Sequence, residues 1–267
     1  MVDRERIDVL LVKLGFFDSR ESAKRAVMSG VVLVNDERID KPGEKVLIDG
    51  EVRIKGDINP YVSRGGLKLE KALKEFDIDL DGRIVIDVGA STGGFTDCAL
   101  QNGASFSYAI DVGYNQLAWK LRQDDRVLSL ERTNFRYMNV DDLKHGRPQF
   151  ACMDVSFISI KLLLPTLEQM LDEFGEIVAL IKPQFEAGRD LVGKKGIVRD
   201  SKVHVLVVKE IVAFVRELGL VPRGLTYSPV KGGEGNIEFL IHIGRVGVDV
   251  ADDVLVEKVV KAAHTEL

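Results

Sequence analysis

Turn-forming residues 56–61 separate two regions of the 267-residue chain that differ in their apolar pattern. In the first region, helical spacing links the apolar residues Ile7, Leu10, Leu11 and Leu14. A second helix is predicted after a cap at Asp18 or Ser19, and it ends before Gly30. Short apolar runs then predict small strands over residues 31–34, 45–48 and 52–55. The first region is therefore expected to be a small α+β domain.

The second region alternates helix and strand patterns from residue 63 onward. Helices are predicted over residues 67–76, 115–122, 162–174 and 203–218. Strands are predicted over residues 84–88, 106–110, 127–130, 150–154, 177–182, 224–229 and 236–243. This alternation predicts an α/β fold with a doubly wound sheet. We expect a small domain over residues 1–58, a linker over 59–62, a large α/β domain over 63–245 and a helical tail over 246–267.

The strand over residues 84–88 continues without a spacer into a glycine-rich turn. The pattern Asp87-x-Gly89-x-x-x-Gly93-Gly94 fits neither the dinucleotide fingerprint G-x-G-x-x-G nor the phosphate loop. The glycines allow a ligand to lie against main-chain N–H groups at the start of the next helix. Asp111 ends the following strand, where an acidic side chain is well placed to bind a ribose diol.

These features resemble the nucleoside site of Rossmann-like methyltransferases that depend on S-adenosyl-L-methionine. A purely structural turn, or another nucleotide ligand, is the alternative. The resemblance implies that the cofactor's methionine end contacts residues from the turn, namely Asp87, Gly89, Ser91, Thr92, Gly93, Gly94 and Phe95. Asp111 would hold the ribose, and Asn134 or its neighbour Thr133 would contact the adenine. A structural role for Asp87 is the alternative at that position.

The first region contains the motifs Arg6-Ile7-Asp8-x-x-Leu11, Ser19-Arg20-x-x-Ala23 and Gly30-x-Val32-x-Val34-Asn35. With these motifs, the region resembles the S4 RNA-binding domain. The resemblance implies binding of structured RNA, with phosphates contacted by Arg6, Arg20, Lys24 and Arg25. The alternative is that these are solvated helix charges, balanced by Asp3, Glu5, Asp18 and Glu21. Arg64, and the glycine- and charge-rich residues 186–200 as a mobile loop or RNA-facing surface, are further candidates.

Four polar residues stand where an open α/β sheet places its ligands, at the carboxyl ends of strands or beside them: Lys68, Asp154, Lys182 and Glu238. Their order, and motifs such as Leu180-Ile181-Lys182-Pro183 and Gly233-x-Gly235-Asn236-x-Glu238, resemble the Lys-Asp-Lys-Glu tetrad of FtsJ-like 2′-O-ribose methyltransferases. With the S4-like region in front, residues 1–245 resemble the TlyA family of ribosomal RNA cytidine 2′-O-methyltransferases, also labelled hemolysins. The implied cofactor is S-adenosyl-L-methionine, and the implied partner is ribosomal RNA in a ribosomal subunit.

The chemistry explains why such a tetrad is useful. A ribose 2′-hydroxyl is a poor nucleophile at neutral pH, so an enzyme must align it and stabilise its developing negative charge. We expect Lys182 to lie nearest the 2′-oxygen, acting electrostatically, or directly if burial beside a second lysine lowers its pKa. Lys68 supplies a second positive charge. Asp154 and Glu238 are expected to orient the two lysines.

Composition adds limits rather than a function. The net charge is −5, so RNA binding must come from a local basic surface. The start of the chain lacks a signal-peptide pattern and no apolar run approaches the roughly 20 residues that span a membrane, so we expect a cytoplasmic protein without a membrane partner. The four histidines and two cysteines lack metal-ligand spacing, so no metal is expected. Trp119 and Phe157 are expected in the core.

Two other functions stay open at this point. An RNA-binding or ribosome-assembly protein can keep a methyltransferase fold without catalysis, although an intact tetrad argues against it. A pore-forming hemolysin is the weaker alternative, because neither a spanning segment nor a secretion signal is visible. The oligomeric state does not follow from the sequence.

Overall fold

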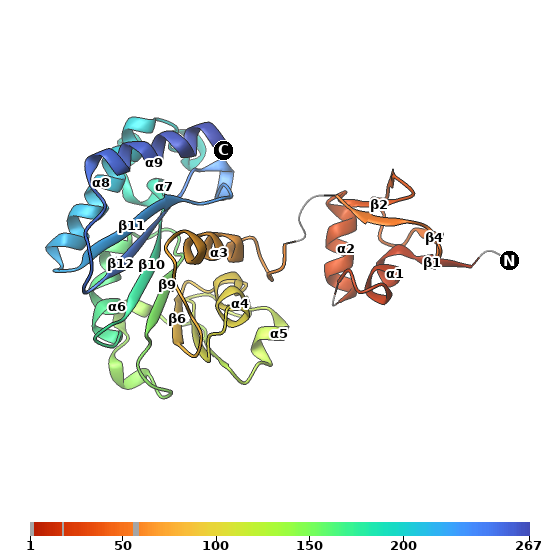
Figure 1. Cartoon of the computed structure of the whole chain (residues 1–267), viewed down its shortest axis with the longest axis horizontal. Coiled ribbons are helices and arrows are strands. Elements are labelled where there is room, and N and C mark those ends of the chain that lie inside the picture. Colours follow the sequence, from red (N-terminus) through yellow and green to blue (C-terminus); the bar gives the residue numbers. More distant parts are fainter. Residues whose placement is uncertain (1–2, 18, 56–58) are drawn as a thin grey trace. The chain divides into compact units, whose positions relative to one another are not determined.

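The computed structural model describes residues 3–17, 19–55 and 59–267, which form two compact units, Met1–Asn59 and Pro60–Leu267 (Figure 1). The candidate cap Asp18 and residues 56–58 of the turn-forming segment lie outside the described residues. Among the described residues, no helix combines the length and apolar character needed to cross a membrane.

The first unit packs two helices against small antiparallel sheets. Its elements are β1 (Arg4–Arg6), α1 (Ile7–Lys13), α2 (Arg20–Met28), β2 (Val32–Val34), β3 (Glu37–Arg38), β4 (Lys45–Leu47) and β5 (Val52–Ile54). The Ser19 side chain caps α2 by accepting a hydrogen bond from the Ser22 N–H. Strand β1 pairs with β4, and β2 lies between β3 and β5. The sequence did not predict β1 and β3, because these very short charged segments have no apolar alternation.

The second unit is built on a seven-stranded sheet in the order β11-β12-β10-β9-β6-β7-β8, which confirms the predicted doubly wound α/β fold. Strand β12 runs antiparallel to both of its neighbours, β10 and β11, and the other neighbouring strands of this sheet pair in parallel. The strands are β6 (Ile84–Val88), β7 (Phe106–Ile110), β8 (Val127–Leu130), β9 (Phe150–Met153), β10 (Glu176–Ile181), β11 (Val221–Tyr227) and β12 (Phe239–Gly244). The helices are α3 (Gly65–Glu75), α4 (Gly94–Gln101), α5 (Trp119–Arg122), α6 (Leu164–Met170), α7 (Pro183–Glu186), α8 (Ser201–Glu217) and α9 (Asp253–Glu266).

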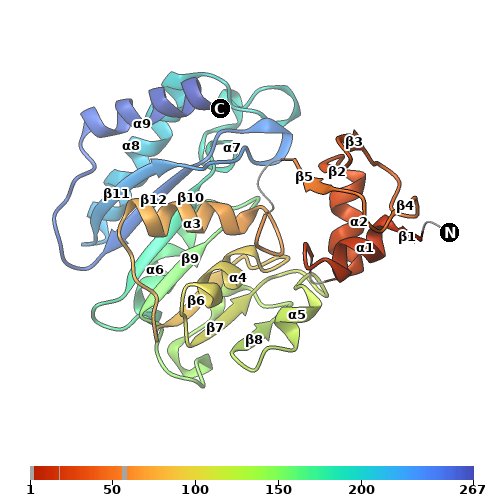
Figure 2. The same ribbon diagram turned by 45° about the vertical axis from the view of Figure 1, so that its right-hand side comes forward.

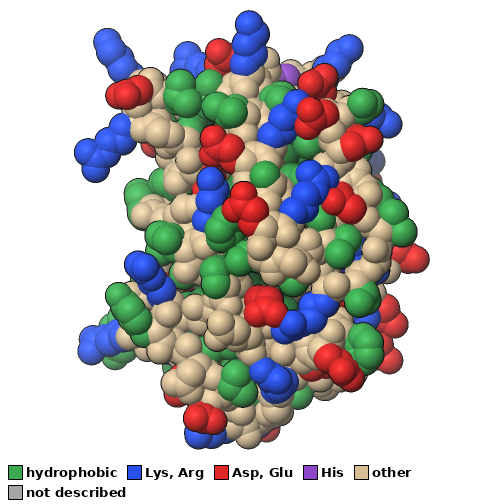
Figure 3. All heavy atoms as spheres, turned by 90° about the vertical axis from the view of Figure 1, so that its left-hand side faces the viewer, with side chains coloured by type: hydrophobic (Ala, Val, Ile, Leu, Met, Phe, Trp, Pro, Cys, Tyr) green, Lys and Arg blue, Asp and Glu red, His purple; other side chains and the backbone are tan. Residues whose placement is uncertain are grey.

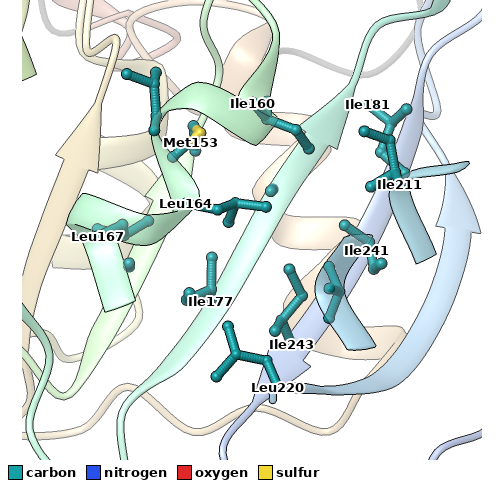
Figure 4. Packing of buried hydrophobic residues seen from close by; sticks show 14 of the residues in the cluster. Met153, Ile160, Leu164, Leu167, Ile177, Ile181, Ile211, Leu220, Ile241 and Ile243 are labelled. Carbon is teal, nitrogen blue, oxygen red and sulfur yellow. The ribbon is translucent and has the colours of Figure 1, made fainter. Parts of the chain in front are cut away.

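The alternating side chains of the buried strands supply two cores, one on each face of the sheet. Helices α3 and α4 cover one face, where Leu69 and Cys98 pack on strand residues such as Val85. Helices α6, α8 and α9 cover the other face (Figure 2). There, Leu164 and Ile211 pack with the isoleucines of β10 and β12 (Figure 4). Helix α9 buries Val256, Val259, Val260 and Ala263 in this second core.

The strand order places a topological switch point between β6 and β9. From β6 the chain moves outward through β7 and β8 on one side, and then returns to β9 and β10 on the other. The connections therefore diverge at the carboxyl ends of β6 and β9, which is where open α/β sheets bind their ligands. Two sequence expectations are wrong here. Trp119 is 71% exposed at the start of the short helix α5, and Phe157 is 90% exposed in the connection after β9, so neither side chain packs on a face of the sheet.

Candidate active site

Two lysines and two carboxylates meet at the carboxyl end of the sheet. Lys68 Nζ lies 3.1 Å from Asp154 Oδ2 and 2.8 Å from Glu238 Oε2. Lys182 Nζ lies 2.5 Å from Asp154 Oδ1. Both lysines are only 8% exposed and Glu238 is 1% exposed. The structure thus brings all four predicted tetrad residues together as a buried cluster whose formal charges cancel.

The topology explains this convergence. Asp154 and Lys182 directly follow the adjacent parallel strands β9 and β10, so their side chains leave the sheet at the same edge. Glu238 directly precedes β12, which pairs antiparallel with β10 and therefore starts at that edge. Lys68 comes from the first turn of α3, whose apolar side, including Leu69, is anchored in the core beneath it.

The charges in the cluster stabilise one another. Burial disfavours the ammonium form of Lys68, but the nearby carboxylates of Asp154 and Glu238 outweigh it and raise the lysine pKa. Burial also opposes ionisation of Asp154, yet the two lysines hold the pKa of this carboxyl below its usual value. At neutral pH, Lys68 is therefore an ammonium group and Asp154 a carboxylate.

These four side chains line a cavity of about 340 Å³ that reaches the glycine turn after β6. Its other walls come from the start of α3, the first glycine turn and the turn before Glu238, with lining residues Ser63, Arg64, Gly65, Asp87, Gly89, Ala90, Ser91, Thr92, Gly94, Phe95, Ser156, Val230, Lys231, Gly232 and Gly233. Most of the residues predicted to contact the methionine end of a cofactor therefore lie in the same cavity as the tetrad.

Glycine is required at two places in the first turn. Gly89 has φ +86°, and a Cβ there would lie 2.5 Å from the carbonyl oxygen of Asp154. Gly93 has φ +96° and directly precedes α4, and a Cβ at this position would meet the side chains of Leu117 and Leu121. Gly93 does not line this cavity, so its observed role is to let the helix start close to its neighbours.

Asp87 is fully buried and ties the turn to α4. Its Oδ2 accepts hydrogen bonds from the Thr96 N–H at 3.0 Å and from the Thr96 hydroxyl at 2.7 Å. Burial raises the pKa of Asp87 to about 7, although the Thr96 bonds oppose that shift. Its Oδ1 has no hydrogen-bond partner among the described residues. Asp87 therefore supports the turn from below while also lining the cavity.

A second cavity, of about 310 Å³, adjoins the first, because both are lined by Gly89, Ser91, Asp154 and Ser156. It contains the predicted ribose and adenine residues Asp111, Thr133 and Asn134, with apolar walls that include Ile110, Val112, Phe135 and Ile158. Asp111 is held in place by the N–H groups of Ser91 and Gly113, at 2.8 and 2.6 Å from its two oxygens.

The predicted phosphate-binding cations of the first unit have protein partners. Asp8, which is fully buried, accepts hydrogen bonds at 3.0 Å from Arg6 and from Arg20. Lys24 pairs with Glu21 at 2.7 Å. Arg25 donates to the Ser22 hydroxyl at 3.3 Å.

Of the acids expected to balance these cations, Glu21 does so, whereas Glu5 pairs with Lys13. The sequence did not identify Asp8 as a partner, because its burial depends on packing between elements. Arg64 belongs to the second unit and lines the larger cavity.

The sequence prediction also missed two side chains that contact the tetrad. The Lys182 ammonium donates to the Ser156 hydroxyl at 3.1 Å, and the Gln184 amide donates to Glu238 Oε1 at 3.4 Å. Both stand two residues after a tetrad member, within the motifs that identified the tetrad. This position, two residues after a tetrad member, could have identified both side chains from the sequence. Among the described residues, no group of three or more His, Cys, Asp or Glu side chains is arranged to hold a metal ion.

The face of the molecule shown in Figure 3 carries Lys and Arg side chains interspersed with Asp and Glu. Such alternation agrees with the small net charge. It lacks the single-signed field that favours nucleic-acid phosphates. The face in Figure 3 therefore presents no extended basic surface for RNA.

Comparison with known proteins gives matches for both units. Residues 61–245 match the family of FtsJ-like methyltransferases, and residues 5–52 match the S4 domain. YqxC of Bacillus subtilis, named as a candidate rRNA methyltransferase, is 56% identical over 99% of this chain and 95% of its own length.

The 16S/23S rRNA (cytidine-2′-O)-methyltransferase TlyA of Mycobacterium tuberculosis is 39% identical over 90% of each chain. A solved structure from Streptococcus thermophilus, described as a hemolysin candidate, is 52% identical with a TM-score of 0.78. It covers 100% of this chain and 98% of that one.

Proposed function

The chain belongs to the TlyA family of FtsJ-like methyltransferases, and from this premise we propose that it transfers a methyl group from S-adenosyl-L-methionine to a ribose 2′-hydroxyl of cytidine in ribosomal RNA. The observation that carries the proposal is the cluster of Lys68, Asp154, Lys182 and Glu238 in a cavity that also reaches the glycine turn. Such a cluster can align a weak nucleophile and stabilise the negative charge that develops on it.

The residues present fit the cofactor. The smaller cavity combines the Asp111 carboxylate, suited to a ribose diol, with apolar walls suited to an adenine ring. The shared lining at Gly89 and Ser91 leads from there toward the tetrad, so the methionine end would lie along the glycine turn. When bound, S-adenosyl-L-methionine supplies an activated methyl group on a sulfonium.

The chain's own residues would do the rest. Lys182 lines the larger cavity and is held by Asp154 and Ser156, which line both cavities, and it is our candidate for the cation beside the 2′-oxygen. Its positive charge would stabilise the negative charge that develops on the 2′-oxygen during methyl transfer. Lys68 adds a second cation, fixed by both carboxylates. Asp154 holds the two ammonium groups apart and aimed into the cavity.

For RNA, the proposal assigns the S4 unit and Arg64. Arg6 and Arg20 are each about half exposed while one side of each is fixed by Asp8. A fixed but exposed guanidinium suits a phosphate, because little rotamer freedom remains to be lost on binding. Arg64 lies in the wall of the tetrad cavity, where it would meet the target nucleotide's own phosphate.

The test uses the full-length protein with purified ribosomal subunits and methyl-labelled cofactor. Lys182→Ala should abolish methyl transfer while the protein stays folded and binds the cofactor. Lys209→Ala, an exposed lysine of α8 paired with Asp253, is the matched control and should keep full activity. Full activity in Lys182→Ala would remove the catalytic assignment. Cofactor and RNA binding without any transfer by the wild type would favour a non-catalytic RNA-binding protein instead.

A further inference from the structure

Two glycine turns, distant in sequence, share one backbone pattern. In residues 193–197, the Gly193 N–H donates to the Ile197 carbonyl at 3.0 Å, and the Gly196 N–H donates to the Gly193 carbonyl at 3.1 Å. In residues 232–236, the equivalent bonds from Gly232 and Gly235 measure 2.9 and 3.2 Å. Each turn carries two consecutive residues of left-handed φ, which are Lys195 and Gly196 in one and Glu234 and Gly235 in the other.

The Asn236 side chain joins these turns. Its Nδ2 donates to the carbonyls of Gly196 and Gly233, both at 3.0 Å. Its Oδ1 accepts from the Val198 N–H at 3.1 Å. Asn236 is only 3% exposed, and every hydrogen bond of its side chain goes to the backbone of one of the two turns or to the residue that follows. On its other side, Val198 is fixed by His204 Nε2, 3.1 Å from its carbonyl oxygen.

The second turn presses directly on the tetrad. A Cβ at Gly232 would lie 2.0 Å from Glu238 Oε1, so the backbone passes closely over that carboxylate. Gly232 and Gly233 also line the cavity. Glu238 in turn holds Lys68 at 2.8 Å. A displacement of this turn would therefore be transmitted through Glu238 to the Lys68 ammonium.

We propose that Asn236 is a positioning residue for methyl transfer, which locks the two turns into one unit and so fixes Glu238 and, through it, Lys68. The inference rests on the proposed function and adds to it a residue that lines neither cavity. Residues 193–197, whose Lys194 and Lys195 are exposed, are fixed by the same Asn236 side chain. The lock acts on the geometry of the reaction, because Gly232 of the second turn lies directly against Glu238 of the tetrad.

The test compares Asn236→Ala with wild type at saturating cofactor, using ribosomal subunits as substrate. We expect kcat to fall by about 10²-fold, the size typical of a small misplacement of reacting groups. The Kd for S-adenosyl-L-methionine should stay unchanged. Amide hydrogen exchange over residues 193–200 and 231–236 should become faster in the variant without any substrate present. Asn139→Ala, which removes another turn-capping asparagine, is the control and should leave kcat unchanged.

The outcomes separate the two proposals. An unchanged kcat in Asn236→Ala, or a loss of activity matched by an equal loss of cofactor affinity, would overturn the positioning role. A wild type that transfers no methyl group would overturn the proposed function, and the exchange experiment would then still decide whether Asn236 couples the turns. Should Asn236→Ala fail to fold, Asn236→Asp decides by the same criteria, because it keeps the acceptor for Val198 but loses both bonds to the turn carbonyls.

Discussion

Two carboxylates in this protein each hold two cations, and they do so in opposite surroundings. In the second unit, Asp154 binds Lys68 and Lys182, whose side chains are each 10% exposed. In the first unit, the buried Asp8 binds Arg6 and Arg20, whose side chains are 44% and 52% exposed. The same arrangement thus presents cations to a cavity in one unit and to the surface in the other. A reacting group must enter the cavity to meet the first pair, whereas a partner can meet the second pair at the surface.

The comparison predicts its largest effect at Asp154. Asp154→Asn removes the carboxylate that holds Lys182 and leaves Lys68 with Glu238 alone, so we expect kcat to fall by about 10³-fold with little change in RNA affinity. Methyl transfer under saturating substrate and filter binding of RNA measure the two quantities. An equal loss in kcat and in RNA affinity would contradict the assignment of catalysis to the second unit and RNA binding to the first.

The arginines of the first unit should behave in the reverse way. Removing both in Arg6→Ala/Arg20→Ala should weaken RNA binding by about tenfold and reduce the slope of log affinity against log salt by about 2. The kcat at saturating RNA should not change, because neither arginine belongs to the unit that holds the tetrad. Lys13→Ala, which removes an exposed lysine paired with Glu5, provides the control. If the double variant keeps the same salt slope, these arginines are solvated charges that do not contact RNA phosphates.

The smallest effect concerns stability at Asp8. Hydrogen bonds from Arg6, opposed by burial and aided by Arg20, lower the pKa of Asp8 to about 2. A lowered pKa stabilises the folded state above the unfolded value near 3.8, and this contribution is lost as the pH falls toward 2. Because both guanidinium groups are partly solvated, we expect Asp8→Asn to cost about 1 kcal/mol at pH 7.

Amide hydrogen exchange in residues 3–17 and 19–55 measures this effect, and the difference from wild type should shrink at pH 3. The single tryptophan, Trp119, lies in the second unit, so its fluorescence reports whether that unit is undisturbed. A difference that grows toward low pH would contradict the assigned charge state of Asp8.

The sequence was sufficient for the sheet and the tetrad, for a physical reason. Strand ends of a doubly wound sheet converge at one edge, so polar residues placed there by the pattern must meet, as Asp154 and Lys182 do. Contacts that depend on packing between elements could not be predicted from the sequence. Neither the burial of Asp8 nor the bonds from Asn236 to Gly196 follow from local pattern, because they join different elements. The prediction that Phe157 lies in the core is wrong, because this residue comes after the end of β9 and not within the strand.

The central claim is that the tetrad acts on a ribose hydroxyl and not on a base. Alkaline hydrolysis of labelled RNA tests it most directly, because a 2′-O-methyl group blocks cleavage of the adjacent phosphodiester. Ribosomal subunits are incubated with the wild-type protein and methyl-labelled S-adenosyl-L-methionine, and their RNA is then hydrolysed in alkali. The account predicts label in alkali-resistant dinucleotides that contain cytidine. It predicts no label with Lys182→Ala. Label in mononucleotides would show base methylation and would contradict the account.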